Sequence, residues 1–468
     1  MCPHDFDNAT GASTKASGVS AISLDFEPKI FIRCTALPQP LVERGHIMSL
    51  PAAREARYAP QLGPISKKIY LHFDLNRTIL MSDSAGGRSM GDTVNYLLAE
   101  VCYGSIKDGV WSAVTPFVPR PGEESSADAG LVTYKWHGDQ TFPYLSQATA
   151  ESVPEGFKDI SSFNKFQKKE RKKLQSSFTN DGHEGSSFRP HFNQVMSALE
   201  LPEECREAAK RASDEIGGTG LLAEFWKDGK YFLLPSFLEF LLFLQSDGGG
   251  LLNNVNIVYR TFGEDIHEVA KELNMFKKGM HPCFPGVQLD ERLCLSDPHG
   301  VFFRNGEGSD GLALAIGTID KAPRDCNDAV AFYAEKNPHI VVAAGFSQCS
   351  EMIKQQFSEK RHAIALRDYW DWWSAHGESD TSGKLLLIDQ SKAETEFHAF
   401  IDDHVESDHA HIVDVRIASD GSVVPPQESI NEVIFRSEPF PAITDRNYFI
   451  DMFVRVTKKA SAASAAAL

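Results

Sequence analysis

Residues 68–80 (KIYLHFDLNRTIL) constrain the fold of this chain more than any other stretch. An apolar run ends in a carboxylate, Asp74, and Asn76 and Thr78 follow at two-residue intervals. A buried strand that ends in an acid and enters a tight loop is how an open α/β sheet presents a reactive group. Ligands bind at the carboxyl ends of such strands. A carboxylate in this position can attack phosphorus and form a covalent aspartyl intermediate.

A second strand is predicted at residues 254–260 (NVNIVYR), which are rich in β-branched and aromatic side chains. Thr261 and Phe262 follow it, and a helical pattern begins shortly afterwards. The free N–H groups and the positive dipole end of a helix N-terminus suit a phosphate. Thr261 and Phe262 are therefore candidates for phosphate binding, although Thr261 on its own also fits an ordinary residue near a helix start.

Lys384 stands at the start of another apolar run, KLLLI. A lysine there can neutralise a phosphate or an aspartyl phosphate as a compact point charge, and an ordinary surface lysine is the alternative. Lys392 is a rival that lies nearer the acidic pair described next. We favour Lys384 because Lys392 leaves little chain before the next predicted strand.

Residues 398–405 (HAFIDDHV) place two adjacent acids, Asp402 and Asp403, after a short apolar strand. Paired carboxylates at a strand end favour a hard cation such as Mg²⁺, which takes oxygen ligands. The alternative is a solvated acidic turn. A further β-like run at residues 411–415 (HIVDV) follows at once, as expected for an α/β sheet.

Taken in order, these features resemble the haloacid dehalogenase-like hydrolase superfamily. Its four motifs are an Asp-x-Asp-x-Thr loop, a Ser or Thr, a Lys and a pair of acids. The matching positions are Asp74-Leu75-Asn76-Arg77-Thr78, Thr261, Lys384 and Asp402-Asp403.

The resemblance implies a three-layer, Rossmann-like α/β core with a mainly parallel sheet and a large inserted cap region. It also implies an aspartyl nucleophile, a catalytic site and a Mg²⁺ cofactor. The implied catalytic residues are Asp74, Asn76, Thr261 and Lys384. The implied phosphate-binding residues are Thr78, Thr261, Phe262 and Lys384. The implied metal ligands are Asp74, the Asn76 carbonyl, Asp402 and Asp403.

Asn76 departs from the family pattern. In family phosphatases the second Asp of the first motif protonates the leaving oxygen and later activates water. An amide cannot exchange a proton in this way, and general acid catalysis contributes on the order of 10²–10⁴ in rate. Asp83, nearby in the sequence, is a candidate substitute, although a loop acid is the simpler interpretation.

We therefore expect a Mg²⁺-dependent hydrolase or phosphotransferase that acts on a phosphorylated small molecule through Asp74. One alternative is a catalytically impaired binding scaffold of the same fold, since Asn76 weakens hydrolysis. A second is a His/Asp hydrolase with a transition metal, although it leaves Asp74 and Thr261 unexplained. Its ligands would come from His398, His404, His409, His411, Asp402, Asp403, Asp408 and Asp414.

Composition limits the class of partner. The formal charge of −17 argues against general binding to nucleic acid or to an anionic membrane. The eight cysteines include no C-x-x-C pair, and no apolar stretch approaches the roughly 18 residues that span a bilayer. We expect a cytoplasmic protein with free thiols whose partner is a small phosphorylated substrate.

The spacing of the motifs predicts the domain organisation. The first two motifs are separated by a segment far longer than a βαβ crossover needs, so a large segment is inserted between them. The resemblance implies that this insertion, residues 82–230, forms a cap. The core comprises residues 66–81 and 231–458, with a smaller elaboration at about 280–335. An irregular N-terminal extension occupies residues 1–65 and a flexible tail residues 459–468. Within the core we expect a buried helix at 235–247, a hairpin at 301–319, a strand at 340–345 and a helical segment at 346–374.

Overall fold

The computed structural model describes residues 57–58, 60–62, 65–82, 88–115, 130–145, 153–246, 250–407 and 410–465. The predicted N-terminal extension, residues 1–65, lies almost wholly outside the described residues. Asp83, Asp408 and His409 also lie outside them. In the part that is described, no helix is long and apolar enough to cross a membrane.

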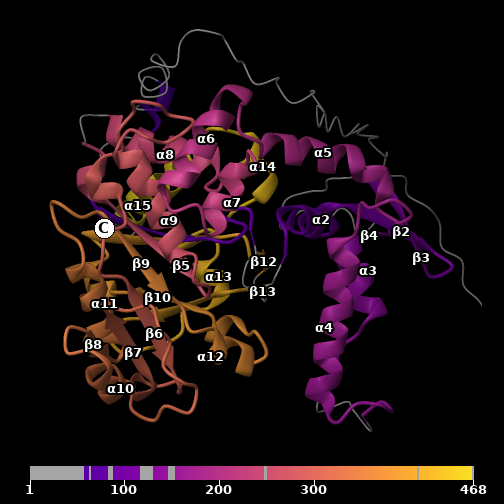
Figure 1. The fold of residues 1–468 in the computed structure, drawn as a ribbon. Coiled ribbons are helices and arrows are strands. Elements are labelled where there is room, and N and C mark those ends of the chain that lie inside the picture. Colours follow the sequence, from indigo (N-terminus) through magenta and orange to yellow (C-terminus); the bar gives the residue numbers. More distant parts are fainter. Residues whose placement is uncertain are drawn as a thin grey trace, which may run out of the picture. The chain divides into compact units, whose positions relative to one another are not determined.

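A mainly parallel sheet of eight strands forms the centre of the structure, in the order β15-β11-β1-β5-β9-β6-β7-β8. Strands β5, β6, β7, β8 and β9 of this sheet are labelled in Figure 1. The six strands from β15 to β6 run parallel to one another, whereas β7 is antiparallel to both of its neighbours. The predicted mixed α/β class with a mainly parallel sheet is thus confirmed. The strands are β1 (Lys68–Asp74), β5 (Val255–Thr261), β6 (Gly300–Arg304), β7 (Leu312–Ile316), β8 (Val341–Ala344), β9 (Ala363–Arg367), β11 (Glu396–Asp402) and β15 (Ile434–Arg436).

The two strands that flank β1 bring their last residues to the same edge of the sheet. Asp74 of β1 is in register with Arg260, the residue before the end of β5. Phe73 is in register with Ile401, the residue before the end of β11. Because all three strands are parallel, their terminal residues lie together at the carboxyl edge, which is where an open α/β sheet binds ligands.

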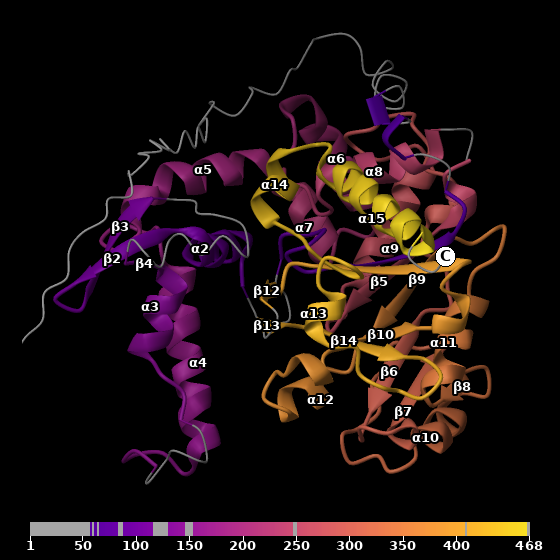
Figure 2. The same cartoon turned by 180° about the vertical axis from the view of Figure 1, so that it is seen from behind.

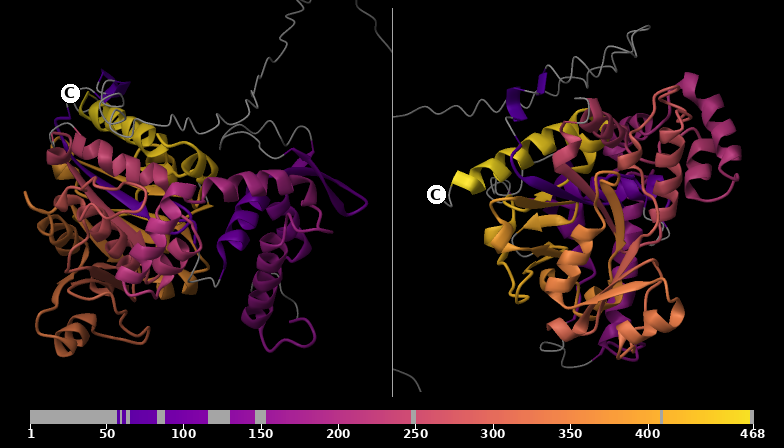
Figure 3. Two further views of the ribbon diagram at one scale, coloured as in Figure 1. Left: turned by 45° about the horizontal axis from the view of Figure 1, so that its top comes forward. Right: turned by 90° about the vertical axis from the view of Figure 1, so that its left-hand side faces the viewer.

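One face of the sheet is covered by helices, among them α8 (Pro235–Ser246), α9 (Ile266–Lys277) and α15 (Tyr448–Ala465) (Figures 2 and 3). Phe73 of β1 packs edge-on against Phe237 of α8, with ring centroids 5.2 Å apart. Phe449 of α15 lies 5.8 Å from Phe73 in a similar arrangement. The predicted buried helix at 235–247 is confirmed as α8. Burial of large aromatic side chains is the main favourable contribution here.

The opposite face is covered by helix α11 (Phe346–Gln355) and by a separate two-stranded parallel sheet, β10 (Lys384–Ile388) with β14 (Val413–Ile417). A buried arginine of the central sheet ties the two sheets together. Arg260 binds both carboxylate oxygens of Asp368 and donates to the carbonyl of Leu385 in β10 at 2.9 Å. Losing one partner of such a buried pair is costly, so Asp368 holds the Arg260 guanidinium where it can reach the Leu385 carbonyl of the second sheet.

The segment between β1 and α8 contains its own secondary structure. It includes a three-stranded antiparallel sheet in the order β3-β2-β4. The side chain of Trp111, in β3, is almost fully buried. The elements are α2 (Met90–Val101), β2 (Tyr103–Lys107), β3 (Val110–Thr115), β4 (Leu131–Thr133), α3 (Tyr134–Thr141), α4 (Ile160–Ser176), α5 (Arg189–Ala198), α6 (Glu203–Glu215) and α7 (Leu221–Lys227). Helix α7 packs on α9 of the core.

The prediction of a wholly helical segment at 346–374 was wrong. This segment contains helix α11, then strand β9 between β5 and β6, then helix α12 (Trp370–Ala375). Strand β9 reads AIALR and is buried along its length. A short apolar run of this kind does not distinguish a buried strand from a helix, because it shows no alternation of polar and apolar positions.

Three further expectations can be compared with the structure. The predicted hairpin at 301–319 is confirmed as β6 and β7, and it extends the central sheet through β9. The predicted strand at 340–345 is β8, which lies at the sheet edge and is partly exposed. The expected flexible tail at 459–468 was wrong for residues 459–465, which continue helix α15. Lysine and alanine favour helix, which explains the extension.

The remaining elements are α10 (Ala329–Lys336), β12 (Val405–Ser407), β13 (Ala410–His411), α13 (Pro426–Ser429) and α14 (Pro439–Thr444). Among them, α10 packs on β7 and β8, and α14 packs on α5 and α8.

Candidate functional site

Three of the predicted residues meet around one amine. Asp74 and Asp402 are the last residues of the neighbouring strands β1 and β11. Lys384 Nζ donates to Asp74 Oδ1 and, at 2.8 Å, to Asp402 Oδ2. All three side chains are buried. The apolar run that Lys384 begins is strand β10 of the separate two-stranded sheet, and Lys384, its first residue, reaches the site from there.

A third carboxylate, Asp403, completes an acidic group. Asp74, Asp402 and Asp403 each offer an oxygen, and these oxygens lie within 4.8 Å of one another. Burial, and then the neighbouring carboxylates, raise the pKa of Asp74 well above its usual range against the opposing effect of Lys384. Burial likewise raises the pKa of Asp403 to about 7, although Arg77 opposes it. A cation bound among the three oxygens would offset this cost.

Thr78 connects the first and last motifs. Its hydroxyl donates to Asp74 Oδ2 at 3.3 Å and accepts from the backbone N–H of Asp403 at 3.1 Å. The side chain is fully buried. The hydroxyl therefore fixes the loop after β11 against the loop after β1. Phosphate binding by Thr78 stays a prediction.

Thr261 is the last residue of β5, on the other side of β1 from β11, and Phe262 follows it. The Thr261 hydroxyl accepts from the backbone N–H of Gly263 at 2.8 Å, and α9 begins a few residues later. The Phe262 ring stacks on Trp373 of α12, with centroids 5.4 Å apart, and the Lys384 amine lies 5.5 Å from its centroid. Both residues thus lie at the carboxyl edge, with Phe262 forming an apolar wall beside the lysine.

Asn76 makes a contact that the sequence did not predict. Its Nδ2 donates to Asp265 Oδ2 at 3.1 Å, and its Oδ1 accepts a long hydrogen bond of 3.5 Å from Ser82. Asp265 occupies the N-cap of α9, yet its side chain makes no capping hydrogen bond. An aspartate at an N-cap ordinarily accepts from the N–H groups of the first turn. Asp265 is instead directed toward Asn76.

Sequence reasoning also missed Arg77 as a contributor to the site. Arg77 NH2 pairs with Asp403 Oδ2 at 2.6 Å, and its backbone is left-handed, with φ of 66°. Non-glycine residues rarely adopt this conformation, and it is worth examining where it occurs. No pattern in the sequence indicated that Arg77 belongs to the site. Asp265 had a weak indication, because it stands at the start of the helix that follows Thr261.

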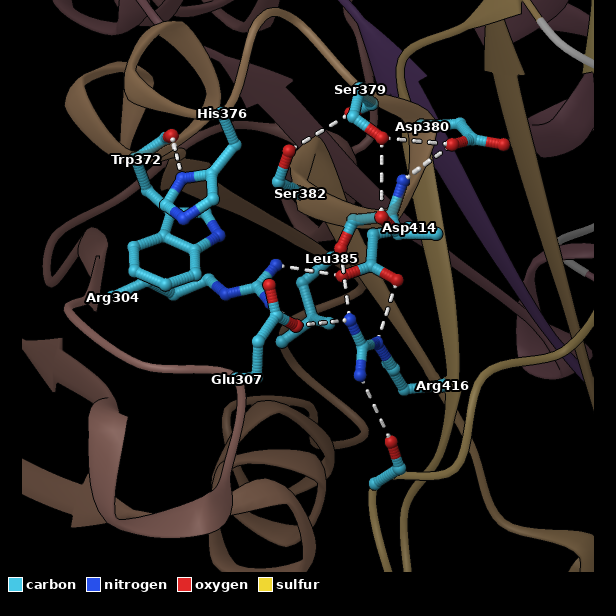
Figure 4. A network of polar contacts seen from close by, with 12 residues as sticks. Arg304, Glu307, Trp372, His376, Ser379, Asp380, Ser382, Leu385, Asp414 and Arg416 are labelled. Carbon is cyan, nitrogen blue, oxygen red and sulfur yellow. Dashed lines mark hydrogen bonds and ion pairs between the residues drawn. The ribbon is translucent and has the colours of Figure 1, made fainter.

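The alternative His/Asp metal site is not assembled among the described residues. Asp414 lies between two arginines, with Arg304 NH1 and Arg416 Nε each 2.7 Å from one of its oxygens (Figure 4). His398 stacks on Tyr70 of β1, away from the strand end. Among the described His, Cys, Asp and Glu residues, Asp74, Asp402 and Asp403 form the one group whose ligand atoms lie close enough together to share a metal ion. Asp408 and His409 lie outside those ranges.

The rival lysine occupies a different environment. Lys392 is exposed and ends a short 3₁₀ turn, Gln390–Lys392. Lys384, by contrast, is buried between two carboxylates, and these raise the pKa of its amine although burial alone would lower it. The geometry therefore favours Lys384 as the third-motif lysine.

No protein-family model, no curated protein and no solved structure matches this chain. The assignment of a function therefore depends on the order of the motifs and on the geometry of this site.

Replacing Lys384 by Met should lower the free energy of unfolding by about 3–5 kcal/mol, because it leaves buried carboxylates without their cation. Mg²⁺ should restore part of that loss and should stabilise Lys384→Met more than it stabilises the wild type. Urea denaturation with and without Mg²⁺ measures both effects. Lys392→Met is the matched control and should change little. Equal losses in the two variants would contradict the buried role of Lys384.

The stability of the metal-free protein should depend on Asp403. Its carboxyl has a pKa of about 7 when folded and near 3.8 when unfolded. Between these values the folded state binds more protons, so this group makes the protein less stable as the pH rises. Thermal unfolding in a chelator at about pH 5 and about pH 8 should therefore show Asp403→Asn gaining stability relative to the wild type at the higher pH. If the difference in stability between Asp403→Asn and the wild type is the same at both pH values, the raised pKa of Asp403 is contradicted.

Proposed function

We propose that this protein is a Mg²⁺-dependent hydrolase or phosphotransferase of the haloacid dehalogenase-like type, acting on a phosphorylated small molecule. The observation that carries the proposal is the contact of Lys384 with both Asp74 and Asp402. Residues from three motifs, far apart in the sequence, share one buried site. If the motif matches were accidental, their residues would not be expected to lie together at the carboxyl edge of a parallel sheet.

Mg²⁺ suits the donor set. Carboxylate oxygens are the ligands it prefers, and it is usually held by one or two carboxylates together with water and substrate phosphate. Asp74, Asp402 and Asp403 would hold the ion, with the Asn76 carbonyl as a further ligand. When bound, it would neutralise charge on the phosphoryl oxygens. The raised pKa of Asp403 in the protein without metal fits a site that is completed by a cation.

Asp74 is the nucleophile in this proposal. As its oxygen forms a bond to phosphorus, the bond from phosphorus to the leaving oxygen breaks, and that oxygen departs with the electron pair. Water then attacks the aspartyl phosphate, releases inorganic phosphate and a proton, and restores the Asp74 carboxylate. Lys384 keeps Asp74 oriented, and Thr78, Thr261 and Phe262 line the phosphoryl position.

Asn76 determines which substrates suit the site. It cannot protonate the leaving oxygen, so esters whose leaving group is stable as an anion are favoured. Aryl phosphates and acyl phosphates are of this kind, whereas alkyl phosphates need a proton. The cap proposed for residues 82–230 would supply further selectivity.

A phosphate-ester panel tests the proposal. The wild type with Mg²⁺ should hydrolyse aryl or acyl phosphates, and Asp74→Asn should remove this activity while retaining the fold, as judged by circular dichroism. A chelator should abolish turnover reversibly. If the wild type does not exceed Asp74→Asn on any ester, the protein is not a phosphatase, and a binding scaffold becomes the better interpretation.

Asn76→Asp should speed the hydrolysis of alkyl phosphates. The increase in rate should be smaller than that expected from general acid–base catalysis alone. The new carboxylate would lie beside Asp265, and two adjacent carboxylates repel each other. The double variant Asn76→Asp/Asp265→Asn replaces that repulsion with a hydrogen bond. The double variant should therefore hydrolyse alkyl phosphates faster than Asn76→Asp, with an increase over the wild type of up to the roughly 10²–10⁴ that general acid–base catalysis supplies.

The measurement is kcat/KM for an aryl and an alkyl phosphate in the four proteins, with Asp265→Asn alone as the matched control. If the wild type already hydrolyses both esters equally well, another group supplies the proton and Asn76 is not the limiting residue.

A further inference from the structure

Helix α4 carries a row of exposed side chains that the proposed chemistry does not use. Lys165, Lys169 and Lys173 recur at intervals of four residues, so they lie along one face of the helix. All three are exposed. Phe166 lies beside them and is 45% exposed. We call these four residues the basic stripe, since they combine repeated positive charge with one aromatic ring in contact with water.

The opposite side of α4 holds the helix on the inserted segment. Gln167 Nε2 donates to the carbonyl of Pro143 at 3.1 Å, and Arg171 Nε donates to that of Phe142 at 2.7 Å. The helix also packs against α2 and α3. Because these contacts occupy the side that carries Gln167 and Arg171, the basic stripe faces outward.

The lysines of the basic stripe make no ion pair with any residue that the structure describes. Two other cations of α4 are paired, Lys168 with Glu378 and Arg171 with Asp139. Glu170 is the single acid of the helix. Three unpaired lysines therefore stand against one unpaired acid, and this surface is positive although the chain as a whole has a formal charge of −17.

Phenylalanine side chains gather at the start of α4, next to the basic stripe. The ring centroid of Phe157 lies 5.1 Å from that of Phe163 and 5.4 Å from that of Phe166. Phe157 and Phe163 are partly exposed, and Phe166 is exposed. We call these three residues the phenylalanine cluster. Exposed apolar side chains that gather in this way mark interaction surfaces.

An anionic bilayer fits this surface better than a nucleic acid does. A helix with lysines on its polar side and phenylalanines beside them is typical of one that lies at a bilayer interface. The unpaired cations are lysines, whereas arginine is the residue whose planar fork suits nucleic-acid recognition. The overall negative charge of the chain opposes the approach of other faces to an anionic surface, so it orients the protein with α4 toward that surface.

We propose that the basic stripe and the phenylalanine cluster of α4 dock this protein on an anionic phospholipid bilayer. The lysine amines contact the phosphate and carboxylate groups of the lipid heads, and Phe166 enters the boundary between the heads and the acyl chains. The attachment is peripheral and reversible, and salt weakens it because ions screen the exposed charges. It is independent of the proposed chemistry at Asp74.

Vesicle sedimentation tests the proposal with the whole chain. The wild type should bind vesicles made of equal parts of phosphatidylserine and phosphatidylcholine, and not vesicles of phosphatidylcholine alone. Lys165→Gln/Lys169→Gln/Lys173→Gln should lower the affinity about a hundredfold, because each lysine close to an anionic surface contributes about fivefold. Phe166→Ala should lower the affinity about tenfold through the loss of a buried aromatic ring.

The matched control is Lys278→Gln/Lys360→Gln/Lys392→Gln, which removes three exposed lysines of the core and leaves the same net charge. It should bind the mixed vesicles as the wild type does, and circular dichroism checks that both triple variants are folded. Equal binding of the wild type to the two kinds of vesicle, no binding to the mixed vesicles, or equal losses in the two triple variants would overturn the inference. Tighter binding of single-stranded RNA than of the mixed vesicles would also overturn it.

Discussion

The burial of three carboxylates beside a single lysine is the constraint on which the rest of this structure depends. Asp74, Asp402 and Asp403 cannot all be ionised at close range without cations, because burial and mutual repulsion both penalise charge. Lys384 supplies one cation from a separate sheet, and Arg77 supplies another from a strained loop. The packing of the small sheet on the central one therefore also completes the site. Arg260, which is paired with Asp368, contributes to that packing by donating to the carbonyl of Leu385 in β10.

Asn76 is held by the side chains around it. The amide donates to Asp265, a side chain that leaves its capping position to accept the hydrogen bond. Gly263 lies between this pair and Thr261, and a side chain there would come within 2.7 Å of the Asp265 carboxylate. Asn76, Asp265 and Thr261 therefore lie close around Gly263, where an added Cβ would require the Asp265 side chain to shift.

Much of the candidate site was predictable because its residues end strands. Asp74, Thr261 and Asp402 each follow an apolar run, and parallel strands place such residues on one edge. Strand β9 was not predictable, since AIALR shows no alternation and fits a helix equally well. Asp265 was also missed, because an acid at the start of a helix is ordinarily a cap.

The sequence by itself determined the α/β class, the strand-end positions of Asp74 and Asp402 and the absence of an acid at Asn76, because these depend on local pattern and residue identity. Only the tertiary structure decided that Lys384 reaches the site from a second sheet, that Asp265 accepts from Asn76 and that Arg77 and Lys135 both contact Glu100. These contacts join residues far apart in the chain, and their formation depends on how sheets and helices pack, which local periodicity does not encode.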